Sequence, residues 1–434
     1  MRRKNVSFCI TTALGLSLAA IAALASCTKP LNLNSSSSDA GDRKTVTIMG
    51  QFSEEDAAKF QASLAPFEKR NNIDVIYESA DNFTSLLPMR ISAFNAPDLA
   101  VLPQPGLMAD LARAGLLVPL TDVIKTQSLR TAYSDDWLSL GTVDEVPYGL
   151  WYRASVKSLV WYQPTAFEAK GYDIPTTWPE LIALSDRIVA DGGTPWCIGF
   201  ESGSASGWPG TDWIEDILLR TAGPETYRQW VDHQLPFNAP QILNAFEEFG
   251  KILKKPKYVA GGAKQVATIS YSESALGIFG DNPECYLHRQ GSFISSFFPK
   301  DKQPRVDYDV FPLPGIKETF GTPILVAGDA IVLLNKTPET TALIQYLATP
   351  EPHKIWAKLG GFISPHKQVP TSAYSDLVTQ NIAQILADAD TIRFDASDMM
   401  PSAVGTETFW TGMLDFAEGK SAETVTKEVD SSWP

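Results

Sequence analysis

The sequence is poor in the side chains that most catalytic and metal sites require. Its 434 residues include four cysteines and four histidines, and no two histidines stand at a metal-ligand spacing. It has no phosphate-binding loop and no dinucleotide fingerprint. The segment around Gly203 resembles the turn that carries a nucleophilic serine, but its central residue is Ala205. We therefore predict no catalytic residue, no metal site and no cofactor.

Positive charge is also scarce in this chain. Its 36 lysines and arginines face 50 aspartates and glutamates, and the formal net charge is −14. Nucleic-acid binding depends on neutralising phosphates, so this balance argues against a nucleic-acid partner. With 50 acidic residues some pair of carboxylates must lie close together, but the sequence marks none as a glycosidase pair.

Long apolar runs are missing everywhere except near the start. Arg2, Arg3 and Lys4 precede an apolar run over residues 8–25, which ends in a Leu-Ala-Ser sequence followed by Cys27. This order is typical of a secretory signal, and a cysteine in this position resembles the bacterial lipobox. We predict a lipoprotein signal peptide over residues 1–26, lipidation of Cys27 and a flexible Ser-rich linker over 27–43.

Two alternatives for this leader stay open, an ordinary cleaved signal and an uncleaved membrane anchor, although the run is short for a spanning helix. If Cys27 is lipidated, the protein lies outside the cytoplasmic membrane, and the lipid alone holds it at the outer face of that membrane. Cys9 lies in the predicted signal peptide and Cys27 is the predicted lipid site. In an exported chain the other two cysteines, Cys197 and Cys285, suggest a disulfide, with two buried thiols as the alternative.

Strand and helix patterns alternate in two series. The first predicts strands over 45–49, 73–77 and 98–102, with helices over 54–71 and 83–94 between them. The second predicts strands over 158–162, 196–200, 309–311 and 330–334, and helices over 164–170, 178–190, 211–220, 239–253 and 272–279. Such alternation indicates an α/β fold with mostly parallel sheets, and 408 residues after the leader suit two units.

The sequence does contain several groups of aromatic residues beside polar side chains. They stand at Trp151-Tyr152-Arg153, at Trp208 to Trp213, at Gln290 to Phe293 and at Phe409-Trp410. Sugars need this mixture, because their C–H faces stack on aromatic rings while carboxylates, amides and arginine bind their hydroxyls.

Several longer runs resemble one protein family. They are Val156 to Tyr162, Pro175 to Leu181, Gly193 to Gly199, Gly207 to Asp216, Cys285 to His288, and Arg393 to Pro401. With the lipobox and the two α/β series, these runs resemble the maltose-binding-like solute-binding proteins of bacterial ABC importers, in particular the α-glucoside-binding branch.

This resemblance implies a two-lobed periplasmic-binding-protein-like fold of type II, in which each lobe is a mostly parallel sheet flanked by helices and sugar binds in the cleft between them. It places one lobe at residues 44–152 and 308–355 and the other at 153–307 and 356–434. Carried over by motif position, it predicts these ligand contacts: Gln51, Asp81, Asn82, Arg153, Trp208, Asp212, Phe293, Asp329, Asp398 and Trp410.

The function that this resemblance implies is capture of an α-glucoside such as sucrose, maltose or trehalose and its delivery to permease subunits, by a protein that works as a monomer and is not an enzyme. Two alternatives remain at this point. One is an exported carbohydrate-active enzyme, which needs two carboxylates at a defined separation. The other is a binding protein for another oligosaccharide or a polyol.

Overall fold

The computed structural model describes residues 43–434. The predicted signal peptide, Cys27 and nearly all of the predicted linker lie outside these residues, so their assignments stay predictions. In the described part of the chain, no helix combines the length and apolar character needed to cross a membrane.

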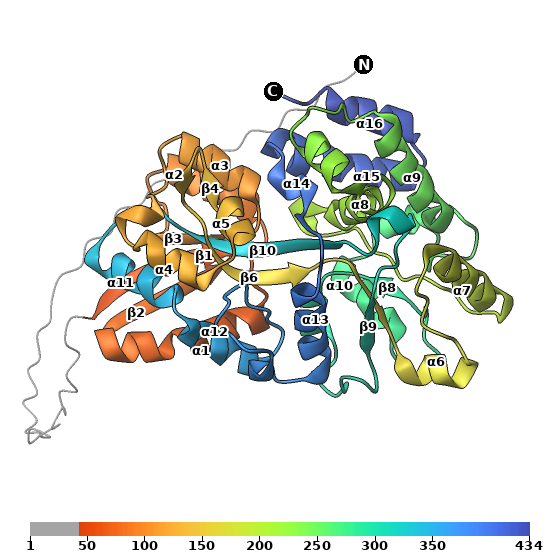
Figure 1. Cartoon of the computed structure of the whole chain (residues 1–434), viewed down its shortest axis with the longest axis horizontal. Coiled ribbons are helices and arrows are strands. Elements are labelled where there is room, and N and C mark those ends of the chain that lie inside the picture. The colour runs from red at the N-terminus through yellow and green to blue at the C-terminus, as the bar shows by residue number, and fades with distance from the viewer. Residues whose placement is uncertain (1–42) are drawn as a thin grey trace, which may run out of the picture. The chain divides into compact units, whose positions relative to one another are not determined.

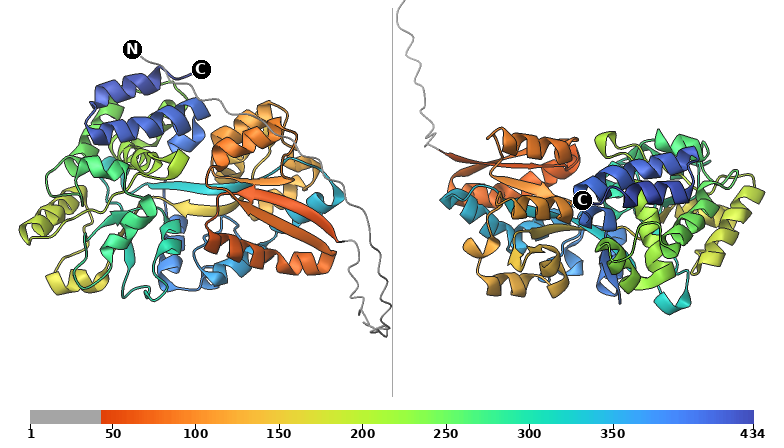
Figure 2. Two further views of the ribbon diagram at one scale, coloured as in Figure 1. Left: turned by 180° about the vertical axis from the view of Figure 1, so that it is seen from behind. Right: turned by 90° about the horizontal axis from the view of Figure 1, so that it is seen from above.

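The described chain folds into two lobes that share a pair of crossing strands (Figures 1 and 2). The first lobe contains β1 (Lys44–Gly50), α1 (Glu54–Asn71), β2 (Ile73–Ser79), α2 (Phe83–Ser92), β3 (Leu99–Leu102), α3 (Pro105–Arg113), α4 (Thr126–Ala132), α5 (Asp135–Leu140), β4 (Thr142–Val143), β5 (Val146–Pro147), α11 (Pro338–Leu347) and α12 (Pro350–Leu359).

The second lobe contains β7 (Leu159–Tyr162), α6 (Pro164–Lys170), α7 (Trp178–Ala190), α8 (Trp208–Val231), α9 (Pro240–Leu253), α10 (Tyr271–Ser274), β8 (His288–Arg289), β9 (Asp309–Pro312), α13 (Leu377–Ala387), α14 (Ala396–Met399), α15 (Trp410–Glu418) and α16 (Ala422–Asp430).

Strands β6 (Leu150–Val156) and β10 (Ile324–Leu333) connect the lobes. They pair antiparallel, with Asp329 opposite Arg153, and Figure 1 shows them side by side, in yellow and cyan, from one lobe to the other. At its far end β10 pairs with β3, and near its start it pairs with β11 (Ile392–Phe394). One six-stranded sheet thus contains β1, β2 and β3 of the first lobe, both crossing strands and β11, while β4 and β5 form a separate pair.

Strand directions follow the path of the chain. β1 pairs in parallel with β2 and β3, as the strand-helix alternation predicts. In the second lobe the expectation of a mostly parallel sheet does not hold for the three named strands, because β7 pairs antiparallel with β8 and β9. The chain enters this lobe through β7 and leaves it through β9 on the way to β10, so these two strands run in opposite directions. The predicted lobe boundaries stay predictions.

Local sequence signals set many of the helix ends. Ser53 caps α1, and its hydroxyl accepts a hydrogen bond from the Asp56 N–H. Thr177 and Glu180 form the predicted capping box at the start of α7. The helices predicted over 54–71 and 164–170 are confirmed to the residue.

Three local predictions differ from the structure. The segment 196–200 forms no strand, because its backbone bonds to Tyr258, Leu287 and Val266 in turn and builds no continuous ladder. The helix predicted over 272–279 is short and breaks into a 3₁₀ turn at Ala275. The crossing strand β6 was not predicted.

Among the described residues the buried apolar side chains form three clusters, and the first includes second-lobe residues such as Trp161 and Cys285 beside those of the first lobe. In the first, the rings of Phe52, Phe60 and Trp356 pack edge to face and tilted. In the second, Trp213 packs against Trp196 and Phe249. A disulfide joins Cys197 to Cys285, with their Cα atoms 5.5 Å apart, which confirms the predicted pairing and links two segments of the second lobe.

Candidate functional site

A cavity of about 180 Å³ lies where the two lobes and the crossing strands meet. The first lobe, the crossing strands and the second lobe all contribute to its wall. The lining residues are Gln51, Asp81, Pro103, Gln104, Arg153, Ser155, Lys157, Ser202, Ala205, Trp208, Tyr271, Phe293, Ala327, Gly328, Asp329, Asp395, Ser397, Asp398 and Trp410.

Eight of the ten ligand contacts predicted from the sequence line this cavity, all except Asn82 and Asp212. Asn82 is exposed and occupies the cap position of α2 instead. Asp212 is fully buried in α8 behind the wall. The structure thus brings most of the predicted set together, and it places these two outside the lining.

The first lobe supplies its polar groups from the ends of three neighbouring strands. Gln51 follows β1, Asp81 follows β2 and Gln104 follows β3. Carboxyl ends of parallel strands meet at one edge of a sheet, which is where α/β proteins bind ligands. Gln51 donates from Nε2 to Thr84 Oγ1 at 3.3 Å, which leaves its Oε1 available.

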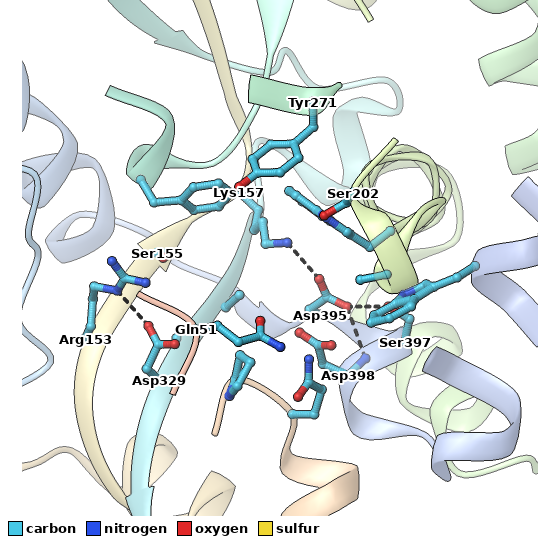
Figure 3. A pocket seen from close by; sticks show the side chains of 18 of the residues that line it. Gln51, Arg153, Ser155, Lys157, Ser202, Tyr271, Asp329, Asp395, Ser397 and Asp398 are labelled. Carbon is cyan, nitrogen blue, oxygen red and sulfur yellow. Dashed lines mark hydrogen bonds and ion pairs between the residues drawn. The ribbon is translucent and has the colours of Figure 1, made fainter. Parts of the chain in front are cut away.

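Arg153 forms two ion pairs at the cavity. Its Nε donates to Asp329 Oδ2 at 2.6 Å and its Nη1 to Asp56 Oδ2 at 2.9 Å, and Figure 3 shows the first of these pairs. Ser296, from the second lobe, also donates to Asp56. Burial would lower the pKa of Arg153, but the two carboxylates outweigh that effect and raise it. The guanidinium is therefore a paired charge that joins both crossing strands to α1.

Lys157 directly follows β6, four residues after Arg153. Its Nζ donates to Asp212 at 2.9 and 3.0 Å, lies 3.1 Å from Asp395 Oδ2, and stands 4.5 Å from the ring centroid of Trp208. Burial would lower the pKa of this ammonium group, but the carboxylates outweigh burial and raise it. Lys157 thus fixes both a carboxylate wall and an aromatic wall of the cavity.

A buried ionic network supports this wall from behind. Arg289 contacts both Asp212 and Asp216, and Asp216 also bonds Arg220 one helical turn further along α8. Glu215 accepts hydrogen bonds from the backbone N–H groups of Ala396 and Ser397 at the start of α14. These bonds hold α14, which carries Ser397 and Asp398 into the cavity.

Three carboxylates in this network, Asp212, Glu215 and Asp395, place oxygens within 4.8 Å of one another, as metal ligands do. Their oxygens already accept from Lys157 and from the N–H groups that begin α14. The protein itself therefore supplies the positive charge and the donors that a cation would otherwise bring, and the arrangement does not fit a metal centre.

Aromatic rings line the cavity next to these carboxylates. Trp208 lies with its ring centroid 5.1 Å from that of Tyr271 and 5.8 Å from that of Phe293. Trp410 lines the cavity beside them and donates from Nε1 to Ser397 Oγ at 3.4 Å. Gly207 permits this packing, because its φ is 108° and a Cβ there would lie 2.0 Å from the Trp410 carbonyl oxygen.

Several residues that line the cavity were not predicted from the sequence. Lys157 and Asp395 both lie within runs that carried the family resemblance, but nothing in the sequence shows that they meet. Gln104 could have been found, because it follows the third strand as Gln51 and Asp81 follow the first two. Tyr271 begins α10 and Ser202 lies in an irregular segment, and the sequence gives no signal that either side chain lines the cavity.

The cleft and its lining define a class of protein: a two-lobed receptor that holds a small solute between polar groups and aromatic rings. The family model of the bacterial extracellular solute-binding proteins matches residues 52–354. The osmoprotective compounds-binding protein GgtB of Synechocystis is 51% identical over 393 residues, 91% of this chain and 93% of GgtB. The α-glucosides-binding periplasmic protein AglE of Rhizobium meliloti is 42% identical, over 90% of this chain and 87% of AglE.

Solved structures agree on the fold. The solute receptor AcbH superposes with a TM-score of 0.79 at 20% identity, over 90% of this chain and 98% of that one. The chain belongs to the bacterial extracellular solute-binding protein family. It is a solute-binding protein of the ABC-importer type and not an enzyme, which removes the alternative of an exported carbohydrate-active enzyme.

Proposed function

We propose that this protein captures neutral α-glucosides and delivers them to the permease of an ABC sugar importer. The observation that supports this most strongly is the cavity wall itself, with Trp208, Phe293 and Trp410 beside carboxylates from both lobes and amides from the first. A pyranose ring needs an aromatic face for its C–H groups and acceptors for its hydroxyls. Both are present within one small cavity.

The charges in the cavity favour an uncharged solute. Arg153 and Lys157 are the cationic side chains that line it, and each is already paired with two carboxylates. Asp81 and Asp398 add acceptors without adding positive charge. An anionic sugar would have to break one of these pairs, whereas neutral hydroxyl groups donate to the carboxylates that are present. We therefore expect phosphorylated and carboxylated sugars to be rejected.

The size of the solute is bounded by the cavity. Its volume of about 180 Å³ favours a small solute over a long oligosaccharide. The similarity to AglE supports α-glucosides such as sucrose, maltose and trehalose. The higher identity to GgtB, an osmoprotective compounds-binding protein, supports a second candidate, a small osmoprotective compound.

A thermal-shift panel tests this assignment. The purified mature protein is heated with sucrose, maltose, trehalose, a glycerol glucoside, glucose 6-phosphate and glucuronic acid. We expect a rise in Tm with one or more of the neutral α-glucosides and none with the two anionic sugars. Chromatography of the same mixtures should recover the sugar unchanged. A Tm rise with the anionic sugars alone would contradict the proposal.

We also propose that the protein works as a monomer anchored outside the cytoplasmic membrane through a lipid on Cys27. The sequence Leu-Ala-Ser-Cys after the apolar run supports this anchor. In Cys27→Ala the mature protein should move to the soluble fraction after a carbonate wash, while wild type stays with the membrane. If the variant remains membrane-bound with its signal cleaved, the lipid anchor is wrong.

A further inference from the structure

The side chain of Gln104 has no role in the local structure around it. The residue stands at the cap position of α3, directly before Pro105, and its backbone carbonyl accepts from the Met108 N–H at 3.1 Å. Its side chain makes no capping bond to that helix. Backbone geometry therefore accounts for the position of the residue and leaves the amide group unexplained.

The side chain of Gln104 is buried, and its amide oxygen is unpartnered. The residue is 5% exposed, and Oε1 has no hydrogen-bond partner among the described residues. A buried polar atom without a partner costs stability, and native proteins keep few of them. Within the described chain, other such atoms belong to Tyr133, Trp151, Trp230, His288, Arg289 and Trp356, none of which lines the cavity.

Gln104 also stands where the two lobes touch. Helix α3 packs against the segment that carries Asp398: a Cβ on Gly106 would lie 2.2 Å from the Met400 carbonyl oxygen. Ser402 Oγ donates to Asp110 Oδ2 at 3.2 Å across the same contact. A glycine is needed at 106 for this approach, so Gln104 is held at the junction between first-lobe and second-lobe residues of the cavity.

We propose that Gln104 is a specificity-determining residue of the cleft, whose amide takes two neighbouring hydroxyl groups of the solute. Oε1 accepts a hydrogen bond from one hydroxyl and Nε2 donates to the next, which is the pattern that a vicinal diol offers. The ligand chemistry rests on the proposed function. The unpartnered amide oxygen and its place in the cavity do not depend on it.

This role predicts opposite effects on stability and on binding. Gln104→Met keeps the length of the side chain and removes its polar atoms, and Gln104→Ala removes them without any risk of overpacking. Both ligand-free variants should have a Tm no lower than that of wild type, because no hydrogen bond is lost. Their Kd for whichever of sucrose, maltose and trehalose binds wild type most tightly should rise by about tenfold or more.

Tyr133→Phe is the matched control, since the Tyr133 hydroxyl is buried and unpartnered but lies away from the cavity. It should keep or raise the Tm and leave the Kd unchanged. Two results would overturn the proposal: a Kd of both Gln104 variants within about twofold of wild type, or a lower Tm of both ligand-free variants. If wild type binds no glucoside, the proposed function fails, and the ligand-free Tm still decides whether Gln104 is a structural residue.

Discussion

The ammonium group of Lys157 lies between the carboxylate of Asp212, 2.9 Å away, and the ring of Trp208, 4.5 Å from its centroid. Of these three residues, Lys157 and Trp208 line the cavity and Asp212 does not. Asp212 therefore shapes the site through Lys157. Trp208 and Asp212 are consequently expected to respond to substitution in different ways.

Trp208→Ala should weaken solute binding strongly with little loss of fold. Trp208 is half-buried at the start of α8, where it faces the cavity and the rings of Tyr271 and Phe293. Truncating such an aromatic anchor costs roughly 2–4 kcal/mol of binding free energy. Calorimetric titration beside thermal melting checks this. Trp208→Phe is the control and should retain much of the affinity. Unchanged affinity in Trp208→Ala would contradict the stacking role.

Asp212→Asn should lower the free energy of unfolding. Removing one partner of a buried ion pair costs about 3–5 kcal/mol, and we expect the lower end because Lys157 keeps Asp395 and Arg289 keeps Asp216. Affinity should fall as a consequence of the displaced Lys157. The control is Glu225→Gln, which removes an exposed pair with Arg228 beyond the break of α8 at Gly223 and should leave the free energy of unfolding almost unchanged. Weaker binding of Asp212→Asn with unchanged melting would mean that Asp212 contacts the solute directly.

The fold was predicted well where the signals are local. The helix over 54–71 begins at a serine cap and has Phe60, Leu64 and Phe67 on one buried stripe, all visible in the sequence. The strand β6 was missed because it is buried along its length and lacks the alternation of a half-exposed strand. The same limit applies to the site: strand-end residues such as Gln51 could be predicted, but the convergence of Lys157 with Asp212 and Asp395 depends on packing between distant segments.

Acid should destabilise the protein in part through His288. Burial, with Arg289 beside it, lowers the pKa of this histidine to about 4, whereas in the unfolded chain it is about 6.5. The neutral form is favoured in the folded state, so its contribution is present above pH 6.5 and is lost as the pH falls toward 4. The loss reaches about 3 kcal/mol at most.

Urea unfolding between pH 7 and pH 4 measures this effect. His353, whose pKa is lowered to about 3 by burial and by His366, contributes to the same loss, so His288→Gln should reduce the pH slope without removing it. His233→Gln is the control, because His233 is partly exposed at the surface beside Asp430. An unchanged slope in His288→Gln would contradict the assignment.

The disulfide between Cys197 and Cys285 should brace the second lobe without controlling the cleft. The bond joins residues 88 apart in sequence, and both cysteines lie outside the cavity lining. The chain-entropy model for a loop of this length gives roughly 4–5 kcal/mol of stabilisation as an upper value. The double variant Cys197→Ala, Cys285→Ala should melt at a lower temperature and bind its solute with unchanged Kd below that temperature. A large loss of affinity in the folded double variant would contradict this separation.

The proposal that the cleft selects α-glucosides is tested most directly by isothermal titration of wild-type protein with maltose and with cellobiose. These two disaccharides contain the same glucose units and differ in the anomeric configuration of one linkage. Trehalose and sucrose extend the α-linked set. We predict saturable binding to at least one α-linked sugar, with cellobiose bound at least about tenfold more weakly than that sugar. Tighter binding of cellobiose than of every α-linked sugar, or no heat with any of them, would contradict the proposal.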